Sequence, residues 1–337
     1  MGAEFYDDKV QSQRLEEDLL TGTSQALVSR FPDGSRVRQA ALYGNLQQQV
    51  TDRHNLSFGV RVSNDDVTLP ETAVSSAAAI DSTDVSGDLG WIFDVARRWQ
   101  LLANVGLGFR APNVFDLGTF GNRPGNRFNI PNATLDSERV AQADIGVRFR
   151  SDRARFELMT YALRYEDRIT SVGTGAITPE GRDVVQSINA ADSSIRGVEA
   201  ALSYRVSDVV SARAILNYTR GEQKVSGSAA EPAGRIPPLN GSISLAYDAS
   251  NDYQLEGWVR FASDQDRLSA RDVRDIRVDP QGTPGWAVIG ARLQKEYAQN
   301  WRFTIALDNL LDKRFRIHGS GLDAPGRNLT ISACYSW

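Results

Sequence analysis

The last ten residues alternate between two kinds of side chain almost without interruption. Residues 328–337 read N-L-T-I-S-A-C-Y-S-W, so alternate positions are apolar and the positions between them are small and polar. A period of two is typical of a β-strand that separates an apolar medium from a wet one. The apolar face fits either the core of a soluble β-sandwich or the lipid-facing side of an outer-membrane barrel. Because this ending does not distinguish the two, the rest of the chain must decide.

The same alternation recurs along the chain and predicts an all-β protein. Charged residues such as Arg61, Glu256 and Arg260 fall on the polar faces of such segments. A hydrated lumen would solvate these charges, whereas a dry sandwich core would need a partner for each one. Fourteen strands are expected, at 3–14, 36–50, 55–68, 83–96, 100–110, 137–150, 154–170, 184–206, 209–222, 237–248, 252–264, 285–297, 301–309 and 327–337.

The connections between these strands alternate between short and long. The short ones are 51–54, 97–99, 151–153, 207–208, 248–252 and 298–300, and the long ones are 15–35, 69–82, 111–136, 171–183, 223–236, 265–284 and 310–326. Tight periplasmic turns at one rim and long extracellular loops at the other are typical of outer-membrane barrels. The sequence therefore predicts a transmembrane antiparallel up-and-down β-barrel.

Composition excludes several other classes of protein. No apolar run approaches the roughly 18 residues that a membrane-spanning helix needs. The net charge of −4, with acidic and basic residues interspersed, gives no nucleic-acid-binding signature. Cys334 is the single cysteine, and His54 and His318 are the two histidines, so the sequence predicts no disulfide framework, metal site or cofactor.

Three stretches of the sequence resemble motifs of one known family. The first is Gly106-Leu107-Gly108-Phe109-Arg110-Ala111-Pro112-Asn113, followed by Asn129-Ile130-Pro131-Asn132-Ala133-Thr134-Leu135, and it resembles the F-R-A-P and N-P-x-L pair of TonB-dependent outer-membrane receptors. The second, Ser194-Ile195-Arg196-Gly197-Val198-Glu199, is similar to the family's G-[VIF]-E strand. The third, Asp308-Asn309-Leu310-Leu311-Asp312-Lys313-Arg314-Phe315, is similar to its closing segment, before the aromatic last strand.

The resemblance implies a receptor of the Gram-negative outer membrane that catalyses no reaction. It implies energy-dependent uptake of a scarce chelate, with a ferric siderophore the default ligand and haem, cobalamin or a saccharide open. The expected partners are this small metal chelate, membrane lipid, lipopolysaccharide and the TonB complex; no nucleic acid is expected, and we expect a monomer. Barrels of this type have about 22 strands and a plugged lumen. With about fourteen strands readable, residues 1–337 are expected to be the C-terminal part of the barrel, without the plug domain, the coupling box or a signal peptide.

The loop at 115–132 provides the first candidate ligand-binding residues, which are Arg123, Arg127, Phe128 and Asn129. Its two arginines are the only full charges between Asp116 and Asp136. Guanidinium groups suit carboxylate, catecholate or phosphate groups of an anionic chelate. A loop that only packs over the barrel mouth is the alternative. His318, in the last long loop, is the fifth candidate.

Two other functions are considered. A complete 14-strand passive pore is one, and an outer-membrane barrel enzyme is the other. His318-Gly319-Ser320 with Asp323 does not by its spacing position a nucleophile and a base. Haem-uptake members commonly place an axial histidine after the F-R-A-P motif, and residues 113–136 contain none. The run Gly106-x-Gly108-x-x-Ala111 superficially matches a dinucleotide motif, but Pro112 and a polar loop are expected where that motif needs a helix.

Overall fold

Fourteen long strands follow one another along the described residues of the computed structural model. They are β1 (Gly2–Lys9), β4 (Arg36–Thr51), β5 (His54–Leu69), β6 (Ala78–Ala96), β7 (Trp99–Arg110), β10 (Glu138–Arg150), β11 (Ala154–Ile177), β12 (Asp183–Arg205), β13 (Val210–Val225), β15 (Asn240–Ala249), β16 (Tyr253–Ala262), β17 (Trp286–Tyr297), β18 (Trp301–Asp308) and β19 (Asn328–Tyr335). The structure describes all residues except 28, 30, 73–75, 119–120, 124–125, 250–252, 276 and 298–299, and the side chains of 118, 122 and 123.

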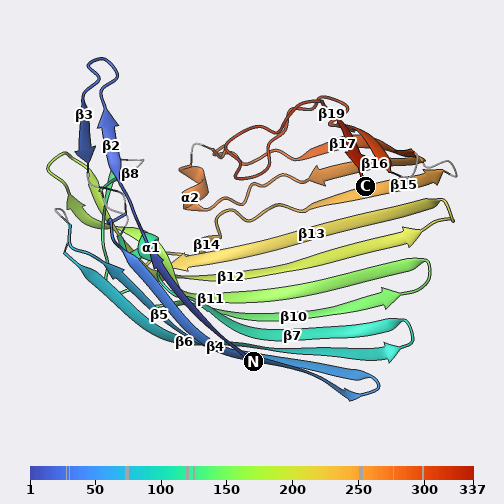
Figure 1. Cartoon of the computed structure of the whole chain (residues 1–337), viewed down its shortest axis with the longest axis horizontal. Helices are drawn as coiled ribbons and strands as arrows, with labels where there is room; N and C mark the ends of the chain where they lie inside the picture. Colours follow the sequence, from blue (N-terminus) through green and yellow to red (C-terminus); the bar gives the residue numbers. More distant parts are fainter. Residues whose placement is uncertain are drawn as a thin grey trace.

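Each long strand pairs antiparallel with the next, from β1–β4 to β18–β19. The all-β prediction and all fourteen predicted strands are confirmed. The result is one curved wall, which Figure 1 shows as an open trough. No register in the described residues joins β19 to β1, so the closure expected of a barrel is not seen.

Connection length separates the two ends of this wall. Figure 1 shows the short turns at its right-hand end, with the long connections, α1 (Val114–Gly118) and α2 (Ala270–Val273) towards the left. The long connections also carry short strands, namely β2 (Arg14–Glu17), β3 (Ser24–Leu27), β8 (Gly121–Arg123), β9 (Arg127–Ile130) and β14 (Glu231–Pro232). The predicted long loop at 171–183 was wrong in part. There β11 and β12 continue as a hairpin because their backbones keep pairing up to Ile177 and Asp183.

The two faces of the wall differ in character. Val67, Leu69 and Ile80 form a buried cluster with Val114 and Leu117 of α1. The face that carries Val67 is therefore called the inner face. By the two-residue alternation, the other face carries exposed apolar side chains, among them Leu42, Val62, Val85, Leu107, Ile243, Val259 and Ile289. An exposed apolar outer face with charges inside is the pattern of a wall between lipid and water.

The last strand follows this pattern. Its residues pair with β18 so that Leu329 lies opposite Leu307 and Ile331 opposite Ile305. Thr330 and Ser332 pair with Ala306 and Thr304, which puts the small and polar set on the other face. The predicted division of this strand into an apolar and a polar face is confirmed.

Candidate functional site

The segment that follows β7 folds back over the upper inner face of the wall. Its one-turn helix α1 buries Val114 and Leu117 against Val67 of β5, and Leu135 joins the same cluster. Leu117 is fully buried. The expectation of a polar loop directly after Pro112 was therefore wrong. Asn113 starts this turn, because its side-chain oxygen accepts hydrogen bonds from the backbone N–H groups of residues 115 and 116.

Arg110 is the centre of an ion-pair bridge at the base of this segment. Its Nη1 donates to Asp116 Oδ2 at 2.6 Å, and its Nε donates to Glu138 Oε2 at 2.7 Å. The other oxygen of Glu138 accepts the backbone N–H of Ile169 on β11 at 2.7 Å. The arginine of the F-R-A-P stretch therefore joins β7, α1, β10 and β11. These contacts indicate a structural role for Arg110 rather than contact with a ligand.

Asparagines fasten the far end of the same segment. Asn132 donates from Nδ2 to the carbonyl of Ser187 at 2.8 Å, and its Oδ1 accepts the backbone N–H of Thr134 at 2.9 Å. Asn189 accepts the backbone N–H of Asp136 and donates to its carbonyl. These bonds attach residues 132–136 to β12, so both ends of the loop are held.

Between these two attachments lies the hairpin of β8 and β9, which carries four of the five candidate residues. Its register pairs Arg123 with Arg127, and β9 runs parallel to the first residues of β12, with Arg127 beside Asp183. Arg127 is exposed, Phe128 is half-buried, and Asn129 is buried with 1% of its surface exposed. The side chain of Arg123 lies outside the described residues. Because Asn129 is enclosed, a ligand cannot reach it in this conformation, and its contact with ligand stays a prediction.

A second polar cluster joins three other long connections. The backbone N–H of Arg235 donates to Asp272 Oδ2 at 3.1 Å, its Nε lies 3.3 Å from Asp272 Oδ1, and its Nη2 donates to Asp275. Ser269 donates to Asp272 at 2.9 Å. Arg277 donates from Nε to Asp275 Oδ1 at 2.9 Å, and this side-chain bond holds the pKa of the Asp275 carboxyl well below its usual range. Arg235 is already matched by two carboxylates, so the cluster is a structural brace.

His318 belongs to this brace. Its Nδ1 lies 2.9 Å from Thr283 Oγ1, which links the last long connection to the one between β16 and β17. Burial lowers the pKa of His318, the charge of Asp272 acts in the opposite direction, and Arg235 adds to the lowering. The described residues show no contact between His318 and the β8–β9 hairpin. The five candidates therefore divide into a group of four and His318, which lies apart.

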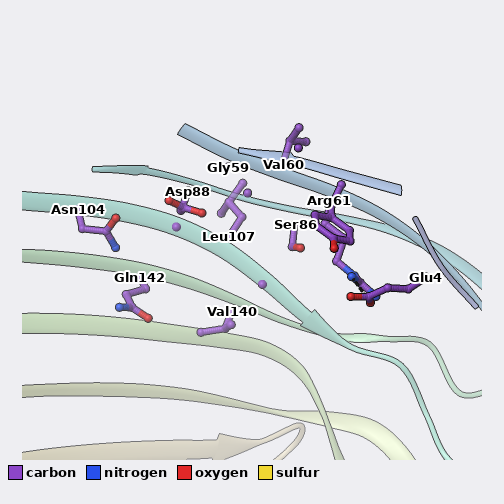
Figure 2. A pocket seen from close by; sticks show the side chains of 15 residues that line it. Glu4, Gly59, Val60, Arg61, Ser86, Asp88, Asn104, Leu107, Val140 and Gln142 are labelled. Atoms are coloured by element: carbon purple, nitrogen blue, oxygen red, sulfur yellow. Dashed lines mark hydrogen bonds and ion pairs between the residues drawn. The ribbon is translucent and has the colours of Figure 1, made fainter. Parts of the chain in front are cut away.

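Glycines, which lack a side chain, leave a hollow in the inner face of the wall below these loops. A hollow of about 530 Å³ spans strands β1 to β10 and is lined by polar groups that include Asp88, Asn104 and Gln142. Figure 2 shows Arg61 directed at Glu4 in this hollow, and their ion pair measures 2.7 Å. A Cβ at Gly59 would lie 2.4 Å from Asp88 Oδ1, so glycine leaves room for that carboxylate. The polar lining is what a water-filled interior requires.

In the part of the chain that the structure describes, no group of three or more His, Cys, Asp or Glu side chains is placed to hold a metal ion. Neither α1 nor α2 has the length or apolar composition to cross a membrane, and the described residues contain no other helix.

A family model for the β-barrel of TonB-dependent receptors, described as "TonB dependent receptor-like, beta-barrel", matches residues 1–310. The chain belongs to the TonB-dependent receptor family. Members of this family lie in the Gram-negative outer membrane and are transporters rather than enzymes. The alternative of a barrel enzyme is therefore set aside.

Several relatives of this TonB-dependent receptor chain are named for different cargoes. A ferric enterobactin receptor of Pseudomonas aeruginosa is 23% identical over 278 residues, which cover 76% of this chain and 36% of that receptor. A copper transporter has the same fold, with a TM-score of 0.82 at 19% identity over 99% of this chain and 53% of its own. A Serratia marcescens hemophore receptor matches with a TM-score of 0.76 at 14% identity, over 99% of this chain and 55% of its own.

The chain thus spans about half the length of these solved structures and about a third of the curated receptor.

The sequence did not reveal the Arg110 bridge or the Arg235 brace. Partners of Arg235 lie 37 and 40 residues away, a separation with no local pattern. Asp116 lies shortly after the stretch 106–113, which contains Arg110, and Glu138 lies shortly after the stretch 129–135. This closeness to the two motifs was the one signal in the sequence for the Arg110 bridge.

Proposed function

We propose that this chain forms part of the barrel of a receptor that captures a small anionic metal chelate at its outer rim for energy-dependent uptake. A ferric siderophore is the favoured ligand. Membership of the TonB-dependent receptor family and the similarity to a ferric enterobactin receptor support this choice. Coupling to the TonB complex would require a plug domain, as in other members of the family.

The observation that carries the choice of an anionic ligand is the register of the β8–β9 hairpin. It sets Arg123 directly opposite Arg127. Residues at opposite positions of an antiparallel pair are neighbours on one face, so two arginines there concentrate positive charge. Catecholate or carboxylate oxygens of an anionic ligand suit forked guanidinium donors. Phe128 follows Arg127 in β9, so by the two-residue alternation it lies on the opposite face of the hairpin, and its contact with a ligand stays a prediction.

The attachments at both ends of the loop make this hairpin a suitable binding element. Arg110 and the Leu117 cluster hold it on one side, and Asn132 holds it on the other. Binding groups on a pre-formed element lose less conformational entropy when a ligand binds. Asn129 would act by holding the hairpin, and His318 by bracing the neighbouring loops.

Other ligands are less well supported. A copper transporter and a hemophore receptor share this fold, but at 19% and 14% identity they show the fold alone. The segment at 113–136 has no histidine to ligate haem. A 14-strand passive pore has no support from the family match.

The test is ligand binding by the receptor that contains this chain, with Arg123→Ala and Arg127→Ala combined. The probe is an iron complex of a tris-catecholate, which carries negative charge, and a neutral ferric tris-hydroxamate serves as comparison. If both arginines pair with desolvated anionic groups, the double variant should lose about 2–5 kcal/mol of binding to the catecholate. That is roughly a 30-fold to several-thousand-fold rise in Kd.

The matched control removes two arginines at the opposite rim, Arg150→Ala with Arg153→Ala. Arg153 lies in the short turn between β10 and β11, and Arg150 ends β10. This control should bind the catecholate complex like the unmodified receptor. Unchanged affinity of the hairpin variant, with the same strand content by circular dichroism, would show that the hairpin only covers the barrel mouth.

A further inference from the structure

Two rows of side chains cross β10 to β13 on the outer face of the wall. The register sets Ala141, Arg164, Ser194 and Glu222 in one row and Ala143, Ala162, Arg196 and Arg220 in the next. The alanines leave a hollow of about 400 Å³, which we name the arginine hollow and which is lined by Ala141, Ala143, Ala162, Arg164, Arg196 and Arg220. Small floor residues with guanidinium groups around them make a concave basic site.

This hollow faces away from the interior. Ala141 pairs with Leu107, and Leu107 pairs with Gly87, which alternates with Val85 of the exposed outer set. The inner face of the same strands carries a hydrogen bond between Tyr161 and Thr219 at 2.8 Å. The arginine hollow is therefore on the side that meets the membrane.

Its height matches the outer edge of the hydrocarbon layer. Arg164 lies about ten residues along β11 from the short-turn end, which is roughly 34 Å of strand at about 3.4 Å per residue. A strand tilt of about 35–45° converts this to a height of roughly 24–28 Å, and the apolar band of such barrels is about 25 Å tall. Immediately below lies a row with exposed Ile145, Val198 and Tyr218. The charges thus lie at the boundary between the apolar band and the long-loop rim.

The charge of the arginine hollow is not balanced by the protein. Arg196 lies directly opposite Arg220 and makes no hydrogen bond or ion pair with any residue that the structure describes. Arg220 reaches Glu222 at 3.4 Å, while its own Nε is buried and lacks a hydrogen-bond partner among the described residues. Charged side chains on a membrane-facing surface are costly unless they are paired, and they mark functional sites.

Neighbouring carboxylates do not neutralise the positive charge of the arginine hollow. Arg164 pairs with Glu166 at 3.0 Å, and Glu222 is shared with Arg267 at 3.6 Å. The hollow and its surroundings thus hold four arginines (Arg164, Arg196, Arg220 and Arg267) and two glutamates (Glu166 and Glu222), so their net charge is +2. This excess of positive charge suits an anionic ligand.

We propose that the arginine hollow binds a phosphate group of a phosphorylated glycolipid of the outer leaflet, the lipopolysaccharide class. Guanidinium forks bind phosphate oxygens in pairs. The adjoining row of Ile145, Val198 and Tyr218 receives the acyl chains, which a soluble phosphate lacks. Because the basic hollow is continuous with an apolar surface, a lipid fits it better than a soluble anion does, and this binding is independent of which chelate the receptor captures.

The experiment measures glycolipid retained by the receptor purified from outer membranes in mild detergent, by native mass spectrometry. The double variant Arg196→Ala with Arg220→Ala should retain at least tenfold less lipopolysaccharide than the unmodified receptor. A second variant, Ala162→Leu, keeps every charge but fills the floor of the hollow, and it should also reduce retention. Because Ala162 is exposed, this change does not disturb a packed core.

The matched control is Arg153→Ala with Arg205→Ala, which removes the same charge at the short-turn end. It should retain lipopolysaccharide normally. A further arm adds inorganic phosphate as competitor, or supplies vesicles of phosphatidylethanolamine with enzymatically dephosphorylated glycolipid. Loss of binding to the dephosphorylated lipid, with little displacement by free phosphate, supports the proposal. Equal retention by the Arg196/Arg220 variant, or full displacement by free phosphate, overturns it.

Discussion

Nη1 of Arg110 donates to Oδ2 of Asp116 at 2.6 Å, and this bond ties the end of β7 to the helical turn that carries the predicted binding loop. The side chain of Asp116 is only 11% exposed, whereas that of Arg110 is 44% exposed. The carboxylate is therefore the enclosed partner, and it depends on the arginine for compensation of its charge.

Removing Arg110 should loosen the loop without unfolding the wall. Arg110→Ala leaves Asp116 and Glu138 without their donor, and hydrogen bonds to charged groups contribute about 1.5–3 kcal/mol each. Because the guanidinium is partly exposed and screened by solvent, we expect a loss at or below the low end of this range, about 1–2 kcal/mol in local stability. Hydrogen exchange of residues 111–137 should accelerate. Arg110→Lys keeps the charge but not both hydrogen bonds, so its exchange rate should lie between those of the unmodified protein and the alanine variant. Unchanged hydrogen exchange in the alanine variant would contradict the structural role of the bridge.

Leu117 is expected to be the most sensitive apolar residue of this region. It is fully buried against Val67, Leu69 and Ile80, and truncation of such a leucine costs about 2–5 kcal/mol. Leu117→Ala should therefore lower the stability of the packed rim, measured by protease sensitivity of the loop and by urea unfolding. Leu311→Ala is the control, because Leu311 is 71% exposed and should tolerate the change. Equal effects of the two variants would show that α1 does not dock as described.

Much of this fold follows from the sequence, for a physical reason. Strand alternation is a local signal, so each strand is visible in its own residues, as in Leu329 and Ile331 of β19. The β8–β9 hairpin was not predicted, because its strands are only three and four residues long and β9 also pairs with β12, more than 50 residues away. Likewise α1 is too short for helical periodicity and depends on packing against Val67. Local patterns thus predicted the wall, while the contacts that shape the rim are between segments distant in sequence.

The candidate residues divide in the same way. Composition picked out Arg123 and Arg127 as isolated charges, and their opposite positions agree with a shared role. Composition could not reveal that Asn129 is enclosed or that His318 bonds to Thr283, because burial depends on the assembled loops.

Gly282 should be irreplaceable in the brace of the long connections. Its φ is +108°, and a Cβ there would lie 2.6 Å from the carbonyl oxygen of Gln265. Strained backbone of this kind costs about 1–3 kcal/mol for a residue other than glycine. Gly282→Ala should therefore break the pairing of Gln265 with Thr283 and increase hydrogen exchange in 263–285. Gly257→Ala, with no atom within 4 Å of its Cβ, is the control and should have little effect.

His318 should titrate below the usual histidine range. Its folded pKa is lowered mainly by burial, so the unfolded form binds a proton more readily. The contribution of His318 to loop stability is therefore fully present above about pH 6.5, the unfolded pKa. It is lost as the pH falls towards the lower folded value. Two-dimensional NMR of the ring protons, with His318→Gln to assign the two histidines, would measure this; a pKa above 6.5 would contradict the burial of the ring.

The β8–β9 hairpin is the element proposed to receive the chelate. The most direct measurement is a crystal structure of the receptor soaked with a ferric tris-catecholate, with the iron located by its anomalous scattering. We expect an iron peak beside Arg123 and Arg127, with catecholate oxygens facing their guanidinium groups. A peak beside the brace of Arg235 and Asp272, or in the inner-wall hollow at Asp88, with none at the hairpin, would contradict it.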